Sequence, residues 1–282
     1  MLMKTDKKNK DKNKSKKKKK APPVDFDKYL YYEKSVQNPQ NELDFFNEKF
    51  SEIKGRKPLT LREDFCGTGA ITCAWAAQGS EHFSYGVDLD PEPVDYGRKH
   101  HLAKLKPEDQ KRVNYLLENV LTAQTPKVDI AFAFNFSYFI FKKRSELLDY
   151  FKKAKDALND DGVFFIDLFG GPDSQTVMVD EIDHGDFKYY WECQQFNPLN
   201  NHCRFAIHFK RKGEKKVKNA FVYEWRMWVM SELKDILTEA GFSQCISYWE
   251  GEDEDGDGDG NFFVTEDAEN CDAWVTYIAA VK

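Results

Sequence analysis

The heptapeptide Glu63-Asp64-Phe65-Cys66-Gly67-Thr68-Gly69 decides the fold of this 282-residue chain. It completes a β-prone run at 59–65 and leads directly into a helical pattern at 69–78. Glycines are required in such a turn because the backbone must reverse tightly and approach a ligand more closely than Cβ atoms allow. A strand, a glycine turn and a helix in this order predict the first unit of a nucleotide-binding α/β sheet.

The end of the next strand supports a nucleotide site. This strand spans 83–88 and ends on Asp88, nineteen residues after Gly69. An acid at that distance is placed to accept hydrogen bonds from both ribose hydroxyls of a nucleotide. Asp90 then caps the following helix, with Pro91 at its first position. These features together are more specific than a glycine turn alone.

The segments around the turn predict an α/β domain. Strands and helices alternate from residue 59 to residue 169, which indicates a parallel sheet with helices on both faces. The expected strands are 59–65, 83–88, 113–118, 128–135 and 163–169, and the expected helices are 25–36, 40–54, 69–78, 91–102 and 143–158.

The alternation ends after residue 169. Three strand-like runs separated by turn residues predict an antiparallel meander, followed by a helix and two strands. These segments are 188–196, 202–211 and 217–228, then 231–240, then 243–250 and 273–281. We therefore expect a tail at 1–21, cap helices at 22–55 and one domain at 56–282 that contains a β insertion at 172–230.

The charge of the chain is unevenly distributed. The net charge is −6, and residues 1–20 alone carry +9, so the remainder carries −15. A Lys-rich run of this kind cannot bury apolar area, and we expect it to be disordered. It could attract nucleic acid or act as a nuclear-import signal. A solvated tail without a partner is the equal alternative.

The six cysteines indicate a reduced intracellular protein. They are scattered, with no C-x-x-C pair and no His at metal-ligand spacing, so we expect neither disulfides nor a metal site. They are Cys66, Cys73, Cys193, Cys203, Cys245 and Cys271. No apolar run is long enough to cross a membrane or to serve as a secretory signal. We expect a cytoplasmic monomer or homodimer, with the nucleus as the alternative location.

The acids that open the turn identify the class of ligand. Glu63 and Asp64 would repel the pyrophosphate of a dinucleotide, which needs a bare helix N-terminus. A nicotinamide site also favours a small third residue where Thr72 stands. Two acids suit instead a cationic methionine moiety that carries an ammonium and a sulfonium group.

With these residues in view, the chain resembles the class I S-adenosylmethionine-dependent methyltransferases of the small-molecule type. The resemblance covers about residues 55–282 and rests on the segments E-D-F-C-G-T-G (63–69), G-V-D-L-D-P (86–91), L-E-N-V (117–120), N-F-S-Y-F (135–139), L-N-D-D-G-V-F-F-I-D (158–167) and L-K-D-I-L-T-E-A-G-F (233–242). It implies a Rossmann-like seven-strand sheet with an antiparallel insertion between strands five and six that covers the substrate.

The resemblance also implies the residues that bind the cofactor, S-adenosyl-L-methionine. They are Glu63, Asp64, Cys66, Gly67, Gly69, Asp88, Leu89, Asn119, Val120 and Asn135. Within this set, Asn119 stands where the family contacts the adenine amino group. Phe65 occupies the place of the usual first glycine, which suggests a turn of different shape. The choice between Glu63 and Asp64 as the donor acid stays open, and Arg62 is expected to pair with an acid or, less favoured, with the donor carboxylate.

The segment at 135–139 supplies the candidates on the acceptor side. Methyl transfer is an in-line displacement for which placement in a dry pocket supplies most of the acceleration. We expect Asn135 and Tyr138 to be catalytic and Ser137 to lie beside them, with simple packing as the alternative for the aromatic residues. The segment lacks the Asn/Asp-Pro-Pro-aromatic run of enzymes that methylate nucleobase amines.

The sequence does not assign a function to the meander or to the acidic loop that follows it. The polar faces of the meander, including His208 as a conceivable base, are expected to face solvent rather than a pocket. The acidic loop 250–272 matches calcium-loop spacing at Asp255, Asp257, Asp259, Gly260 and Glu266, but strands rather than helices flank it. Acids at the carboxyl edge of the sheet would favour a cationic or amine acceptor.

The sequence thus predicts an S-adenosylmethionine-dependent methyltransferase that acts on a small molecule, with an amine as the favoured acceptor. One alternative is an RNA or protein methyltransferase directed by the basic tail. A second is a catalytically silent protein that binds the donor and acts through interaction. The identity of the acceptor cannot be derived from these residues.

Overall fold

The computed structural model describes residues 25–252, 258–269 and 271–282. The predicted tail 1–21 and two acids of the calcium-loop pattern, Asp255 and Asp257, lie outside these residues. No helix in the described ranges is both long and apolar enough to span a membrane.

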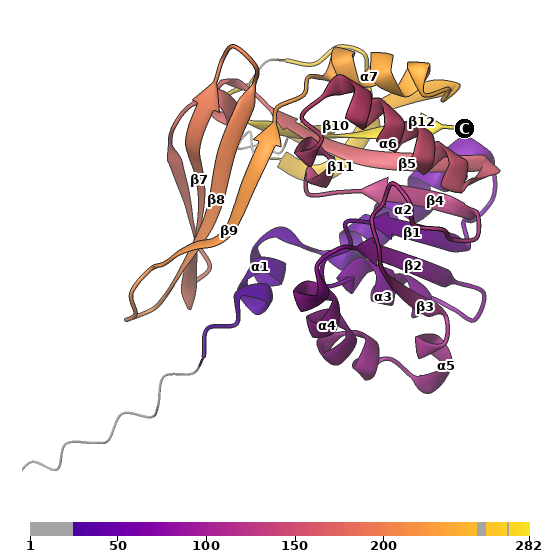
Figure 1. Ribbon diagram of the computed structural model, residues 1–282, viewed down its shortest axis with the longest axis horizontal. Helices are drawn as coiled ribbons and strands as arrows, with labels where there is room; N and C mark the ends of the chain where they lie inside the picture. The colour runs from indigo at the N-terminus through magenta and orange to yellow at the C-terminus, as the bar shows by residue number, and fades with distance from the viewer. Residues whose placement is uncertain (1–24, 253–257, 270) are drawn as a thin grey trace, which may run out of the picture.

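The main sheet has eight strands in the order β11-β10-β12-β5-β4-β1-β2-β3 (Figure 1). The five central strands are parallel, and β12 and β10 are antiparallel additions beside β5. Their bounds are β1 Thr60–Asp64, β2 Phe83–Asp88, β3 Val113–Leu117, β4 Val128–Ala133, β5 Leu158–Gly170, β10 Gln244–Glu252, β11 Gly258–Val264 and β12 Trp274–Val281. This confirms the predicted α/β sheet and adds β11 at its edge.

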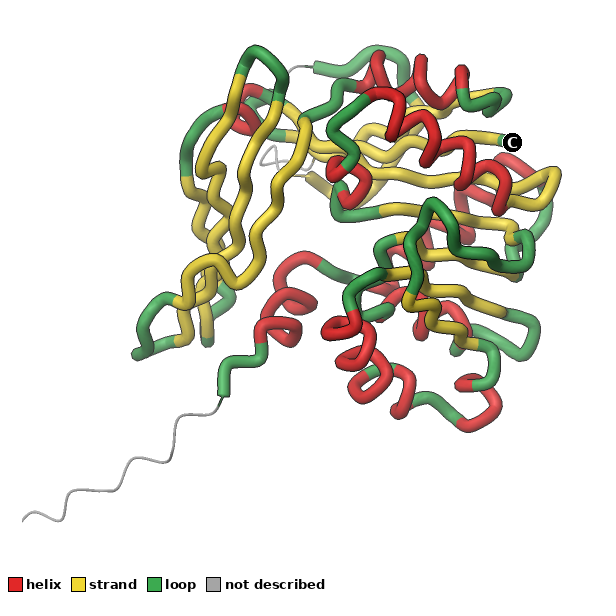
Figure 2. The backbone as a smooth tube through the Cα atoms, viewed as in Figure 1, coloured by secondary structure: helices red, strands yellow, loops and turns green. Residues whose placement is uncertain are grey.

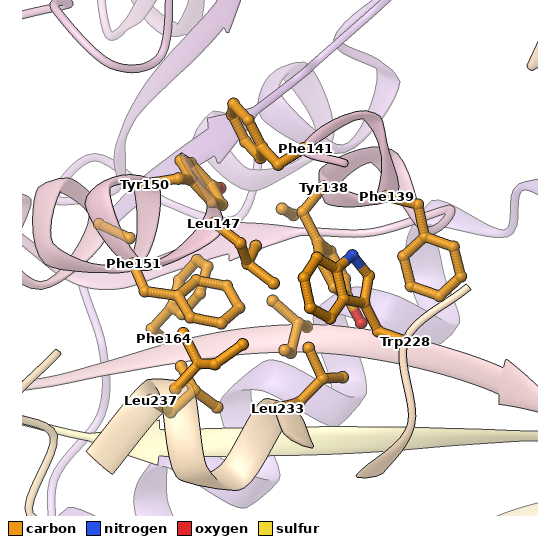
Figure 3. Packing of buried hydrophobic residues seen from close by; sticks show 14 of the residues in the cluster. Tyr138, Phe139, Phe141, Leu147, Tyr150, Phe151, Phe164, Trp228, Leu233 and Leu237 are labelled. Atoms are coloured by element: carbon orange, nitrogen blue, oxygen red, sulfur yellow. The ribbon is translucent and has the colours of Figure 1, made fainter. Parts of the chain in front are cut away.

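Helices cover both faces of this sheet. Their bounds are α1 Lys28–Val36, α2 Pro39–Lys54, α3 Ala70–Ala76, α4 Pro91–His100, α5 Pro107–Gln110, α6 Arg144–Ala157 and α7 Met230–Glu239. The helices α2 and α3 pack one face through Phe46, Phe50 and Trp75. On the other face α6 and α7 contribute Phe151, Leu237 and neighbouring side chains (Figure 3). Because both faces are buried, residues 163–169 of β5 are apolar except for Asp167.

A second, four-stranded sheet stands beside the carboxyl ends of the main strands (Figures 1 and 2). It is antiparallel, in the order β6-β7-β8-β9, and lies between β5 and β10 in the sequence. Its strands are β6 Val179–Asp183, β7 Phe187–Asn197, β8 His202–Arg211 and β9 Val217–Arg226. The expected meander is thus present, with β6 as an additional strand.

Helix α1 lies between the two sheets. Asp27 caps it by accepting the Leu30 N–H at 3.1 Å. Phe26, Tyr31 and Tyr32 pack on the second sheet in one cluster with Phe187 and Phe209. The short turns η2 (Ser137–Ile140) and η3 (Pro172–Gln175) follow the carboxyl ends of β4 and β5.

Candidate active site

The glycine turn after β1 contains three residues in the left-handed region. Phe65, Gly67 and Gly69 have φ values of 58°, 53° and 63°. The sequence suggested a turn of different shape because Phe65 replaces a glycine, yet Phe65 adopts the conformation that a glycine would. Such a conformation is strained for a bulky residue. The Phe65 ring packs against Tyr150 at a centroid distance of 5.6 Å, which helps to hold it.

Asp88 at the end of β2 is tied to the same turn. Its Oδ2 accepts the Gly67 N–H at 2.8 Å, and its Oδ1 accepts the Asp90 N–H at 2.9 Å. Each carboxylate oxygen keeps a further lone pair for a ligand hydroxyl. A Cβ atom added at Gly67 would meet nothing within 4 Å, so the backbone there faces open space. The arrangement is able to accept a ribose beside the turn.

The two adjacent acids of the turn have different surroundings. Asp64 pairs with Arg62 at 2.8 Å and accepts the Tyr150 hydroxyl at 3.0 Å on its other oxygen. All three side chains are buried. Both carboxylate oxygens of Asp64 are thus engaged inside the protein, which favours Glu63 as the acid that meets a ligand; the predicted cofactor contact of Asp64 stays a prediction. Arg62 meets Asp64 and not a donor carboxylate.

Glu63 is buried without a cationic partner. Its Oε2 accepts the Thr72 N–H at 2.9 Å and also the Thr72 hydroxyl. Burial raises the pKa of Glu63 to about 8 and that of nearby Glu42 to about 7. In the described ranges no Lys, Arg or His forms an ion pair with either carboxyl group. A cationic ligand would offset the cost of burying these charges.

A cavity of about 320 Å³, here called the turn cavity, lies over the carboxyl ends of β1, β2 and β4. Its charged lining residues are Glu63, Asp64, Asp88, Asp90 and Lys28. Lys28 is itself paired with Glu92 at 2.8 Å. The Gln37 Oε1 atom of the lining is buried without a hydrogen-bond partner. An acidic cavity with an unpartnered acceptor suits a cationic ligand and not a phosphate.

Helix α1, which lies in the segment predicted to form cap helices, contributes to the lining of the turn cavity. Tyr29 and Tyr32 join Lys28 in the lining. Glu33 fastens the helix to the glycine turn, because its Oε1 accepts the Thr68 hydroxyl at 2.7 Å and lies 2.7 Å from His101 Nε2. The helical spacing of aromatic residues was the only available signal, and it does not say which surface the helix covers.

Four predicted cofactor residues lie outside the lining of the turn cavity, namely Gly69, Leu89, Asn119 and Val120. Leu89 is 64% exposed beside Asp88. Asn119 accepts the Leu121 N–H at 2.9 Å through its side-chain oxygen. Val120 is buried, and its carbonyl accepts a hydrogen bond from Arg62 at 3.2 Å. Their contacts with the cofactor stay predictions. Cys66 does line the cavity, and burial keeps its thiol protonated by raising its pKa.

A strained turn follows β4. Asn135 and Phe136 both have φ of 56°, so two consecutive residues other than glycine are left-handed. Asp167, near the end of β5, accepts the Asn135 N–H on Oδ2 at 2.6 Å and the Phe136 N–H on Oδ1 at 2.9 Å. The turn places Asn135 in the lining of the turn cavity, and its predicted roles in cofactor binding and catalysis stay predictions.

Tyr138 is not placed for catalysis. It is fully buried, and its hydroxyl donates to the Asp167 carbonyl at 2.7 Å. The turn η2 rotates its ring into the core with Phe139 and Phe151, as Figure 3 shows. The predicted catalytic role is therefore corrected to packing. Ser137 does border the turn cavity, and its hydroxyl donates to the Phe134 carbonyl at 2.6 Å.

A second cavity of about 480 Å³, here called the aromatic cavity, lies between the second sheet and the ends of β5 and β12. Its walls include Phe136, Phe169, Trp191, Phe205, Tyr223 and Trp225. Trp191 stacks on Phe205 at 4.8 Å, and Tyr223 stacks on Trp225 at 4.4 Å. Among the described residues that line it, the charged ones are the acids Asp173, Asp180 and Glu250.

The two cavities meet at a shared set of residues. Tyr32, Asn135, Tyr223 and Trp225 line both of them. The side chains of Tyr32 and Tyr223 interact with each other. We call these four residues the junction. They bring together α1, the turn after β4 and strand β9, which lie far apart in the sequence.

The other candidates of the insertion and the acidic loop lie elsewhere. His208 is held between Glu192 at 2.8 Å and the Asn219 N–H at 2.8 Å, and it lines neither cavity. This polar face therefore points away from the site. Much of the expected acidic loop is the hairpin of β10 and β11. Asp259 accepts hydrogen bonds from Asn261, and Glu266 pairs with Lys234.

Comparison with known proteins matches this geometry. Residues 66–164 fit a family model described as a methyltransferase domain. No curated protein gives a significant match. An S-adenosylmethionine-dependent methyltransferase from Clostridium acetobutylicum superposes with a TM-score of 0.65, at 19% identity over 89% of this chain and 96% of that one. An S-adenosylmethionine-bound amino pentose methyltransferase from Micromonospora echinaspora gives 0.62, at 14% identity over 92% and 99%.

A third solved structure extends the comparison. A sugar N-methyltransferase from Streptoalloteichus gives a TM-score of 0.59, at 14% identity over 95% of this chain and 97% of that one. At these identities the likeness concerns the fold. The chain nevertheless covers nearly the whole length of each of these solved structures.

Proposed function

We propose that this chain is a class I S-adenosylmethionine-dependent methyltransferase that transfers the methyl group to an amine of a small molecule. The observation that carries the proposal is the junction, where Tyr32, Asn135, Tyr223 and Trp225 line both cavities. A two-substrate transfer requires two adjoining compartments with a shared wall, because the reacting atoms must approach in line. We assign the turn cavity to the donor and the aromatic cavity to the acceptor.

The turn cavity fits the donor by charge. When bound, S-adenosylmethionine supplies a methyl group activated by its sulfonium centre. The cavity is lined by hydrogen-bond acceptors that have no cationic partner among the described residues: Glu63, Gln37 and Asp88. Of these, Asp88 lies beside the glycine turn. We expect Glu63 and Gln37 to hold the ammonium group and Asp88 to hold the ribose.

The aromatic cavity favours an amine. Its aromatic walls can hold a cationic or methylated amino group through cation–π attraction. Asp173, Asp180 and Glu250 add negative charge, which would repel carboxylate and phosphate substrates. Two of the solved relatives are, by name, an amino pentose methyltransferase and a sugar N-methyltransferase, and both names agree with this choice.

The residues of the junction act by placement. Tyr32 and Tyr223 present hydroxyl oxygens that can accept an N–H of the acceptor and so turn its lone pair toward the turn cavity. The rings of Tyr223 and Trp225 exclude water from the path of transfer. A base is required only for an acceptor that enters protonated.

A pair of neighbouring substitutions tests the assignment of the acceptor cavity. Met178 lines the aromatic cavity, whereas Val177 is 66% exposed and does not. Met178→Trp should fill the cavity and abolish methyl transfer to a panel of small amines, with donor affinity retained. Val177→Trp is the matched control and should transfer normally. Equal activity of the two variants, or transfer to the matched alcohols and not to the amines, would overturn the proposal.

A further inference from the structure

The turn after β4 holds a conformation that its residues do not favour. Asn135 and Phe136 are both left-handed, and neither is a glycine. Residues in such conformations persist only where the surroundings enforce them, and they cluster at functional sites. Asn135 stands at the junction, and the Phe136 ring lines the aromatic cavity 4.5 Å from the Phe169 ring. The shape of this turn therefore sets the wall between the two cavities.

One side chain enforces this shape. The two oxygens of Asp167 each accept one backbone N–H of the turn, at 2.6 Å and 2.9 Å. The Tyr138 hydroxyl donates to the Asp167 carbonyl and so ties the end of β5 to η2. A carboxylate presents a separate acceptor oxygen to each of the two N–H groups, whereas an amide of the same shape replaces one of these oxygens by an NH₂ group, which cannot accept.

The burial of the Asp167 carboxylate is energetically unfavourable. Asp167 is 5% exposed, and in the described ranges no Lys, Arg or His pairs with it. Nearby Glu42 adds a further negative charge. Burial of an acid without a cationic partner costs free energy, and acids in such surroundings cluster at functional sites. Asp167 lines neither cavity, so any functional role must act through the residues that it holds and not through contact with a substrate.

We infer that Asp167 is a positioning residue for methyl transfer, which holds the Asn135-Phe136 turn in the left-handed conformation that places Asn135 at the junction. The inference rests on one part of the proposed function, namely that methyl transfer takes place at the junction. It does not depend on the acceptor being an amine. Asp167 touches neither substrate and acts through the two backbone N–H groups.

The test compares Asp167→Asn with a matched control. Asp129 is also a buried acid, and it accepts the Leu59 and Thr60 N–H groups at 2.7 Å and 3.1 Å at the other end of the sheet. We expect Asp167→Asn to lower kcat at least about tenfold, with donor Kd changed less than about threefold, because one charge-assisted hydrogen bond to the turn is lost. Asp129→Asn should lose stability and keep kcat.

A glycine at position 135 separates positioning from simple loss of structure. Glycine adopts the left-handed region freely, so in an Asn135→Gly background the Asp167→Asn change should lower kcat much less than it does alone. If Asp167→Asn does not fold, the glycine background must restore folding. An unchanged kcat in Asp167→Asn, or an equal loss in both backgrounds, would overturn the inference.

Methyl transfer in this test is measured to whichever fraction of an extract the unmodified protein labels, RNA and protein included. A macromolecular acceptor would then count against the proposed function and leave the test of Asp167 intact.

Discussion

Lowering the pH should weaken binding of S-adenosylmethionine, and Glu63 should account for most of the change. The carboxyl of Glu63 is buried with Thr72 as its described hydrogen-bond partner, and burial raises its pKa to about 8. Below that pH the group is mainly protonated in the free protein. The cationic donor requires the ionised form, so binding lowers this pKa and releases a proton. Affinity must therefore rise with pH up to about 8.

The magnitude follows from the fraction of Glu63 that is ionised. Well below the pKa this fraction changes about tenfold per pH unit, which is about 1.4 kcal/mol. Between about pH 6 and about pH 7 the donor ammonium, with a pKa near about 8, stays mostly protonated. We therefore expect the donor Kd to fall about tenfold over this interval.

Calorimetry in two buffers of different ionisation enthalpy measures both the affinity and the released proton. Glu63→Gln keeps the acceptor oxygen for Thr72 but cannot ionise, so its donor Kd should be weak and nearly independent of pH. Any smaller dependence of the donor Kd on pH that is left in this variant belongs to nearby Glu42, whose pKa burial raises to about 7. The reasoning is refuted if the unmodified protein binds the donor equally well at both pH values, or if Glu63→Gln keeps the full slope.

Three further outcomes are expected. Asp88→Ala removes charge-assisted hydrogen bonds of about 1.5–3 kcal/mol each and should weaken donor binding at least about tenfold by calorimetry, with an unchanged circular dichroism spectrum. Asp64→Asn leaves buried Arg62 without its partner and should cost about 3–5 kcal/mol of unfolding free energy in denaturant titrations; a loss below about 1 kcal/mol would contradict the buried pair. Removal of residues 1–20 should shift Tm by no more than about 2 °C, since a solvated tail adds no packing; a larger loss would mean that the tail docks on the acidic body.

The parts of the fold that the sequence predicted are those with strong local signals. The largely apolar run at 163–169, which only Asp167 interrupts, predicts β5, and the glycine turn predicts the end of β1, without reference to distant residues. Strands β6 and β11 were missed because their signal is not local. All five residues of β6 are exposed, and it exists through pairing with β7. The glycines and acids of β11 read as a loop until β10 pairs with it.

The candidate site residues also differ in whether a local sequence signal identifies them. Asp88 could be identified as a candidate ribose ligand because its spacing from the glycine turn is typical of such an acid. The choice between Glu63 and Asp64 could not be made, since it depends on which helix covers each face of β1: Thr72 of α3 meets Glu63, and Tyr150 of α6 meets Asp64. Tyr138 was misplaced because the turn η2 rotates it into the core.

The contribution of α1 and the junction depends on long-range docking. Tyr32 reaches the site because α1 packs on the second sheet, where its side chain meets that of Tyr223. No spacing rule connects residues of these two elements. The walls of the aromatic cavity were likewise visible only as alternating strand residues until the second sheet was placed beside β5 and β12.

The most direct test of the account is where a labelled methyl group goes. The full chain and the chain lacking residues 1–20 are each incubated with methyl-labelled S-adenosylmethionine and a cell extract separated into RNA, protein and low-molecular-weight fractions. We predict that the low-molecular-weight fraction is labelled, that the label resides on basic compounds, and that removal of the tail changes neither result. Label that appears mainly in RNA or protein and disappears with the tail would contradict the account.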